Sequence, residues 1–291
     1  MALASFSSSL GGLSSSSGGV SGRDFFDLVK AIGESKSKQE EDRIIAEEVV
    51  YLKKAIPQYV TNKKKTKELV VRALYVEMLG QDASFAYIKA VELCASTNII
   101  QKRVGYLAAS LCLSPAHEFR FMLVNQLQRD INSTNHLEAC AALSAVCKIV
   151  NEDMIPAVIG DVLKVLRHDV DAVRRKAVCA LHRLYQLDKT CCIDHVEKVR
   201  RMICDKDPSV MGASLGLLHA MIVDSPNSFK DLVPSLVSIL KQVADHRLPR
   251  EYDYHRVPAP WIQMHLLRML AVLGRGDRAA SEGSSRPSRP Y

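Results

Sequence analysis

The side chains best suited to metal chemistry in this chain are its cysteines, of which there are 8. Cys191, Cys192 and Cys204 lie near His195 in the sequence and offer, with it, the nitrogen and sulfur ligands that zinc prefers. Their spacing fits no standard zinc finger, however, and no two cysteines have the C-x-x-C spacing. Most of the cysteines lie on apolar helical faces, so we interpret them as reduced core residues of a cytosolic protein and expect neither a metal nor a cofactor.

The sequence offers no recognisable set of catalytic side chains. It lacks a Walker loop, a Rossmann glycine fingerprint, a G-x-S-x-G elbow, an HExxH motif and the protein-kinase motifs. His182, His219 and His265 lie in predicted helices, with no acidic residue at the spacing of a catalytic triad. Gly212 and Gly216 lie inside a predicted helix, where they allow close packing rather than phosphate binding. We therefore expect a protein that is not an enzyme.

Basic side chains are the remaining candidates for a binding site, since the chain carries a net charge of +7. This charge suits an acidic partner, such as a phosphoinositide surface, nucleic acid or an acidic protein. The alternative interpretation is a solvated surface with a mild excess of lysine and no acidic partner. A helix is predicted at 62–79, and the lysines in its first turn interact unfavourably with the positive end of the helix dipole. A bound anion, or screening by water, would offset this energetic cost. Arg174, Arg175 and Lys176 are expected to point outward. The candidate contacts with an anionic membrane are Lys36, Lys38, Lys53, Lys54, Lys63, Lys64, Lys65, Lys67 and Arg72.

The elements that position these side chains form a repeat. An apolar helical face begins at intervals of 33, 36 and 37 residues, at Val104, Leu137, Val173 and Val210. Four positions further on, each face carries a small residue: Ala108, Ala141, Ala177 and Ser214. A repeat of this length with helical periodicity inside it is typical of stacked helix pairs. The pattern predicts an all-α protein, a HEAT/armadillo-like α-solenoid that forms a right-handed superhelix of helix pairs.

A solenoid of this kind offers a long surface for partners and seldom a catalytic pocket, so the pattern favours a binding function. One alternative is a generic HEAT-repeat scaffold of the nuclear-transport or phosphatase-regulatory type. Such scaffolds often line a concave face with Asn, Trp or acidic residues, whereas the single tryptophan here, Trp261, lies outside the repeat phase. Another is a nucleic-acid binder built on the basic helices of residues 170–201. Aromatic side chains for base stacking are missing there apart from Tyr185, so no nucleic acid is expected as a partner.

Composition divides the chain into three parts. Residues 1–23 are rich in Ser and Gly and are expected to be disordered. Residues 24–274 carry the helical periodicity, whereas residues 275–291 have none and are also expected to be disordered. In the loop at 244–260 prolines exclude helix, and the aromatic side chains of Tyr252, Tyr254 and Trp261 are expected to pack on the array. No uninterrupted run of about 18 apolar residues predicts a membrane span.

Several motifs in residues 25–274 occur in the order found in one known family. They include Met78-Leu79-Gly80, the hexapeptide that runs from Lys102 to Leu107, and Val257-Pro258-Ala259-Pro260-Trp261. In these motifs and their order, the chain resembles the N-terminal trunk of the large adaptins, the big subunits of heterotetrameric vesicle-coat adaptors. The positions that carry the family motifs are Gly80, Lys102, Arg103, Gly105, Tyr106, Pro258, Pro260 and Trp261.

Longer matches, such as GQDASFAYI, DMIPAV and VRRKAVCAL, look most like the epsilon large subunit of the fourth heterotetrameric adaptor complex. The resemblance implies an adaptin α-solenoid trunk over residues 24–274 that sorts cargo for intracellular protein transport. It implies adaptor small, medium and second large chains as partners, together with an Arf-type GTPase and weak contact with an anionic membrane. The implied location is the cytoplasm, on the cytosolic face of the trans-Golgi network and of coated vesicles.

Three departures from the family pattern change these expectations. Gly33 stands where relatives that bind acidic dileucine cargo have an arginine, and the run Lys63–Lys65 lies about one turn before the phosphoinositide-binding lysines of the alpha relative. We therefore expect loose attraction to an anionic membrane, at most about 1 kcal/mol per basic residue, rather than a specific pocket. Family trunks also continue beyond the segment that matches Leu273-Gly274, so the chain resembles a truncated trunk.

Overall fold

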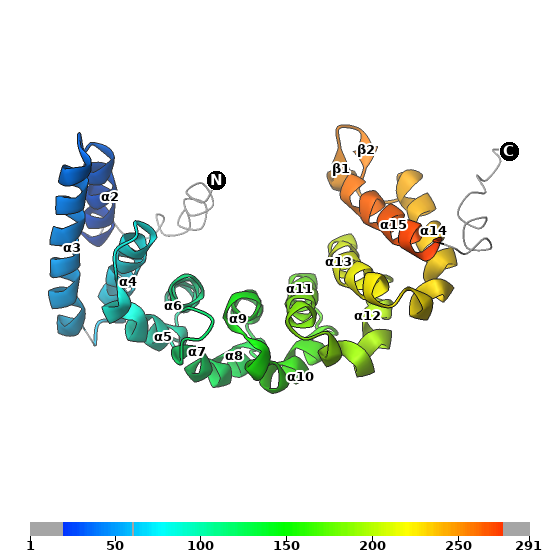
Figure 1. Cartoon of the computed structure of the whole chain (residues 1–291), viewed down its shortest axis with the longest axis horizontal. Coiled ribbons are helices and arrows are strands. Elements are labelled where there is room, and N and C mark those ends of the chain that lie inside the picture. The colour runs from blue at the N-terminus through cyan, green and yellow to red at the C-terminus, as the bar shows by residue number, and fades with distance from the viewer. Residues whose placement is uncertain (1–19, 60, 276–291) are drawn as a thin grey trace. The chain divides into compact units, whose positions relative to one another are not determined.

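Residues 20–59 and 61–275 are described by the computed structural model, with side chains described from Phe25 onward. Helices make up almost all of this part of the chain (Figure 1). The predicted all-α solenoid class is therefore confirmed. The stretches predicted to be disordered, 1–23 and 275–291, lie outside the described residues, except that residues 20–23 begin the first helix and that residue 275 follows the last.

The chain divides into two compact units, residues 1–126 and 127–291. The elements of the first unit are α2 (Val20–Gly33), α3 (Lys38–Gln58), α4 (Lys63–Met78), η2 (Ser84–Ala86), α5 (Tyr87–Cys94), α6 (Ile99–Cys112), α7 (Phe119–Met122) and the start of α8 (Val124–Ile131). Two short helices, α7 and α8, meet at Leu123, whose N–H donates to the carbonyl of Arg120.

Helix α4 is the centre of the first unit. Its side chains are buried without a break from Leu69 to Val76, because it packs against α3 on one face and against α6 on another. Leu69 joins Leu52 of α3 in one core cluster, while Val70 joins Val104 of α6 in a second. A helix enclosed in this way has no solvent-facing stripe along its middle. Arg72 lies in this enclosed part of α4, so its charge needs a partner inside the protein.

The second unit alternates between long helices and shorter ones. Short 3-10 helices and one hairpin connect them. Its elements after α8 are α9 (His136–Ile149), η3 (Glu152–Met154), α10 (Ile155–Val165), α11 (Asp171–Leu187), η4 (Lys189–His195), α12 (Val196–Met202), α13 (Pro208–Asp224), η5 (Pro226–Leu232), α14 (Val233–Ala244), η6 (Arg250–Tyr252), β1 (Asp253–Tyr254), β2 (Val257–Pro258) and α15 (Pro260–Leu273).

The helices of the second unit form two layers. Within one layer, α11 packs against α9 on one side and α13 on the other, and α13 packs against α15 (Figure 1). In the second layer, α10, α12 and α14 each pack on the helix that follows them: α11, α13 and α15. This is the arrangement of stacked helix pairs that the repeat predicts.

The buried positions of α11 recur in α13 after a step of 37 residues. The corresponding pairs include Val173 with Val210, Ala177 with Ser214, and Leu181 with Leu218. The predicted phase is therefore right for these two helices. It is wrong for α9, where Leu137 is 52% exposed and the buried face begins at Ala139. Leu137 belongs to the capped first turn of α9, where an apolar residue resembles the start of a core face without being part of one.

Capping side chains define where several helices begin. Asn98, Asn135 and Asp207 each accept a hydrogen bond from a backbone N–H in the first turn of the helix that follows. Gly80 follows the end of α4 and has a positive φ of 87°. Its N–H donates to the carbonyl of Glu77 and the next N–H donates to Val76, which is the Schellman pattern of hydrogen bonds.

The loop expected at 244–260 contains a short hairpin in which β1 and β2 pair antiparallel. Its turn residues His255 and Arg256 both have positive φ, 49° and 66°, as a type I′ turn requires. The prediction that Tyr254 and Trp261 pack on the array is wrong, because these side chains are 54% and 58% exposed. The two rings instead contact each other edge to face, with centroids 5.2 Å apart and ring planes at 62°.

Candidate functional site

Four of the predicted lysines lie near one turn of the first unit. Lys53 and Lys54 are near the end of α3, and Lys63 and Lys64 begin α4. All four are exposed, and we call them the lysine corner. The Thr66 hydroxyl closes the turn between the helices by donating to two of its carbonyls. The corner therefore presents four exposed cations near the junction of α3 and α4.

The other predicted lysines do not join this group. Lys36 and Lys38 lie at the opposite end of α3, and the distance along the helix from Lys38 to Lys54 is about 24 Å. Lys38 also forms ion pairs with Glu41 and Asp42 at 3.0 and 3.1 Å.

Lys65 and Lys67, in the first turns of α4, are only partly exposed. Lys65 lies 3.8 Å from the Glu68 carboxylate, which offsets part of its charge. Within the lysine corner, the ammonium of Lys53 lies 5.4 Å from the centre of the Phe85 ring, which is within the range of a cation–π interaction. The Lys53 side chain is nevertheless exposed to solvent.

Arg72 is not a membrane contact, which corrects the prediction from the sequence. Its side chain is buried in the middle of α4, where its Nε and Nη2 donate to the two oxygens of Glu48 at 2.7 and 2.6 Å. The guanidinium also lies 4.8 Å from the centre of the Tyr51 ring. Because α4 is enclosed by α3 and α6, this two-point ion pair ties α4 to α3 and leaves no charge for a lipid.

A second arginine expected to face outward is also buried. Arg174 donates through Nε and Nη2 to both oxygens of Asp205, each at 2.9 Å, and through Nη1 to the carbonyls of His168 and Asp169. Burial opposes the charged form of Asp205, but the hydrogen bonds from Arg174 and a backbone N–H hold the pKa of that carboxyl below its usual value. The pair joins α11 to the loop that precedes α13.

The family-motif residues of α6 serve helix packing. A Cβ atom on Gly105 would lie 2.6 Å from the backbone N of Cys94 and 2.8 Å from the carbonyl oxygen of Ala90. The backbones of α5 and α6 therefore touch at this point, and only glycine fits. Lys102 and Tyr106 are buried on the same helix, whereas Arg103 is exposed.

The motif residues near the end of the second unit are placed differently. Pro260 is the first residue of α15, where its fixed φ suits a helix start. Pro258 lies in β2 and is partly exposed, and Trp261 projects from the first turn of α15. These residues shape the hairpin and the start of α15, and they bring no acid, base or nucleophile together.

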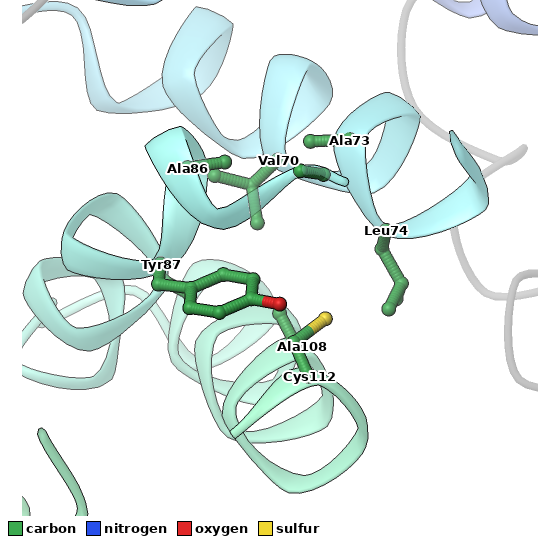
Figure 2. A pocket seen from close by; sticks show the side chains of 9 residues that line it. Val70, Ala73, Leu74, Ala86, Tyr87, Ala108 and Cys112 are labelled. Atoms are coloured by element: carbon green, nitrogen blue, oxygen red, sulfur yellow. The ribbon is translucent and has the colours of Figure 1, made fainter. Parts of the chain in front are cut away.

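A small, partly open apolar space lies between α4, α5 and α6. Figure 2 shows side chains of Val70, Tyr87 and Cys112 directed toward it from these three helices. Its volume of about 10 Å³ is that of a single water molecule, so it holds no substrate. Burial and the nearby Glu77 carboxylate raise the pKa of the Cys112 thiol to about 12, which keeps it protonated and unreactive.

The residues proposed as an alternative zinc set do not gather in the structure. Cys191 and Cys192 have sulfur atoms 3.6 Å apart, but the described part of the chain contains no group of three or more His, Cys, Asp or Glu side chains placed to hold a metal. Among the described helices, none is both long and apolar enough to cross a membrane.

Comparison with known proteins gives a match to one protein family. Residues 41–287 match the family model described as the adaptin N terminal region. The chain is 48% identical over 260 residues to the AP-4 complex subunit epsilon of Arabidopsis thaliana, which covers 89% of this chain and 28% of that protein. It is 44% identical over 256 residues to the human AP-4 complex subunit epsilon-1, covering 88% of this chain and 22% of that protein.

A solved structure is similar in fold. A chain from a homology model of the full-length AP-3 complex, in an intermediate open conformation, superposes with a TM-score of 0.60 at 23% identity. The superposition covers 75% of this chain and 36% of that one. The present chain thus spans about a quarter of the length of the AP-4 epsilon relatives. In this chain, the matched region consists of the stacked helix pairs described above.

Proposed function

The chain belongs to the adaptin family, and from that premise we propose that it forms part of the large-subunit trunk of a vesicle-coat adaptor complex. The observation that carries the proposal is the family match, which extends over nearly all of the described helices. Stacked helix pairs offer a long surface, which suits a role in binding partners rather than in catalysis. The similarity to AP-4 epsilon subunits supports the fourth adaptor complex in particular.

The partners proposed are the small, medium and second large chains of the complex, together with an Arf-type GTPase. The proposed location is the cytosolic face of the trans-Golgi network and of the vesicles formed there, where the complex sorts cargo. Support comes from the relatives, whose names describe them as subunits of the AP-4 complex. Large interfaces of this kind need an extended surface, and solenoids provide one without a deep pocket.

Co-purification tests this function directly. The full chain is expressed with each of the four types of adaptor small chain, and the result expected is stoichiometric recovery of the small chain of the fourth complex. The partners are compared after gel filtration, so that only stable complexes are counted. Recovery of none of the four by a chain that is folded and helical by circular dichroism contradicts the proposal.

We also propose that the lysine corner contacts an anionic membrane. Its four ammonium groups are exposed, and cations near an anionic leaflet gain attraction that adds from one residue to the next. Replacing Lys63 and Lys64 with glutamine is expected to lower co-sedimentation with phosphatidylserine-containing vesicles roughly tenfold at low salt. Vesicles of phosphatidylcholine alone give the baseline.

A matched variant separates the lysine corner from general basicity. Lys198→Gln with Lys206→Gln removes the same charge from exposed positions in the second unit and is expected to leave binding nearly unchanged. Equal loss in both variants assigns the attraction to net charge and contradicts a contact at the corner.

A further inference from the structure

A groove between α9 and α11 has the charge of an anion-binding surface. Its volume is about 440 Å³, and it is lined by Cys147, Lys148, Cys179, His182, Arg183 and Gln186. Two of these side chains, Lys148 and Arg183, are basic, one is an imidazole, and none is a carboxylate. The groove lies wholly within the second unit, so it shares no residue with the lysine corner.

The cations of the groove occupy equivalent positions in neighbouring repeats. The buried face of α9 recurs in α11 after a step of 35 residues, which places Ala142 of α9 at the position of Ala177 of α11. The same step relates Lys148 to Arg183. Equivalent positions on packed helices lie side by side, about 8–10 Å apart. The two charges are therefore spaced along the stacking direction and are not gathered at one point.

Positive charge from α11 also reaches further along α9. Burial raises the pKa of the Cys140 and Cys147 thiols, and the nearby cation Lys176 opposes that rise at both of them. Arg175 acts in the same sense as Lys176 on Cys140, while the Asp171 carboxylate acts against both cations there. Lys176 therefore lies near the groove, and the Asp171 carboxylate offsets part of the positive charge beside Cys140.

Imidazole side chains continue from the groove across α13 and α15. Gly216 of α13 leaves space beside the His182 ring, since a Cβ there would lie 3.4 Å from two of its atoms. His219, one 37-residue step after His182, faces His265 of α15 with ring centroids 6.4 Å apart. The Nδ1 atom of His265 is buried and has no hydrogen-bond partner among the described residues. Three imidazoles, those of His182, His219 and His265, therefore follow one another from α11 to α15.

We propose that this groove binds an acidic segment of a partner protein in an extended conformation. The groove is lined from α9 and α11, and the imidazoles of His219 and His265 extend the polar surface to α13 and α15. From α9 to α15 there are three helix-to-helix steps of 8–10 Å, or about 24–30 Å, which an extended peptide of about seven to nine residues covers. Carboxylates spaced along such a peptide match cations spaced from helix to helix. The Gln186 amide lies 3.5 Å from Arg183 Nη1 and 3.4 Å from His182 Nε2, so it links these two side chains into one polar surface.

A compact phosphate group fits this surface less well. Phosphate sites in proteins use converging donors, such as the first turn of a helix or an arginine held in a fixed orientation. Lys148 and Arg183 are exposed and come from different helices, and no described helix begins in the groove. The binding proposed here does not require assembly into an adaptor complex, so it is tested on the chain alone.

Fluorescence anisotropy provides the test. The probe is a fluorescein-labelled peptide of about ten residues that alternates Glu with Ser, titrated with the full chain at about 0.1 M salt. Saturable binding is expected, and Lys148→Glu with Arg183→Glu is expected to weaken it roughly tenfold. The control, Lys30→Glu with Arg43→Glu, makes the same charge change at exposed positions of α2 and α3 and is expected to change affinity less than about twofold.

Three results would overturn the proposal. The first is no binding of the acidic peptide by the unsubstituted chain, including the case in which inositol hexakisphosphate binds instead. The second is equal weakening in the groove variant and the control variant, which indicates nonspecific attraction to a basic protein. The third is equal binding of a Lys-Ser peptide of the same length, which shows that charge complementarity plays no part.

Discussion

Replacing Gly105 with alanine is expected to lower the free energy of unfolding by about 3 kcal/mol or more. The added Cβ would lie 2.6 Å from a backbone nitrogen and 2.9 Å from a backbone carbon of α5, and neither atom belongs to a flexible side chain that can turn away. Helices α5 and α6 must therefore separate, which loosens the packing of both against α4. Chemical denaturation followed by circular dichroism measures the loss.

Gly160 provides the matched control for this substitution. It lies in α10 and is exposed, and a Cβ added there would meet no neighbouring group within 4 Å. Gly160→Ala is expected to stabilise the protein by about 0.5–1 kcal/mol, because alanine restricts the unfolded chain and favours helix. If both glycines tolerate alanine equally well, the close approach of α5 and α6 is incorrect.

Removing Arg72 is expected to cost about 3–5 kcal/mol, since Arg72→Met leaves the Glu48 carboxylate buried without its cation. The side chains of the pair are only 10% and 8% exposed, so water compensates little of that loss. Thermal and urea unfolding of the full chain measure the change in stability. A membrane contact in the same position would alter vesicle binding and leave folding intact, so the result also decides between the two roles.

The double variant Glu48→Met with Arg72→Met separates the pair from its surroundings. Because it removes both buried charges, it is expected to recover most of the lost stability. The exposed pair of Arg43 and Glu47, with side chains 68% and 66% exposed, is the control, and Arg43→Met is expected to change stability by less than about 0.5 kcal/mol. Similar costs for Arg72→Met and Arg43→Met would contradict the buried ion pair.

The repeat made most of the fold predictable, because the packing that buries α11 buries α13 in the same way. Val173 and Val210 mark that shared face, and a helical period in the sequence is enough to find it. Arg72 and Arg174 were misplaced for a physical reason. The carboxylates that neutralise them belong to Glu48 and Asp205, 24 and 31 residues away, and no local pattern predicts a partner at that distance.

The candidate sites were only partly predictable. Clusters of lysine in the sequence led to the lysine corner, but the length of α3, which separates Lys38 from Lys54, appears only once the helix is built. The groove between α9 and α11 was missed altogether. Its signal in the sequence is a pair of cations, Lys148 and Arg183, at one repeat step from each other, and that step becomes known only after the phase of α9 is corrected.

The hairpin formed by β1 and β2 marks where this array accommodates extra length. Buried residues of α13 recur in α15 after 52 residues rather than 37, as Val210 and Ile262 or Leu218 and Leu270 illustrate, yet α15 stacks on α13 as the other helices stack on their neighbours. The additional chain leaves the core as a surface loop whose tip is His255 and Arg256. Insertions and deletions among homologues should concentrate at this tip, which makes it a natural point for attaching an epitope or a fluorescent reporter.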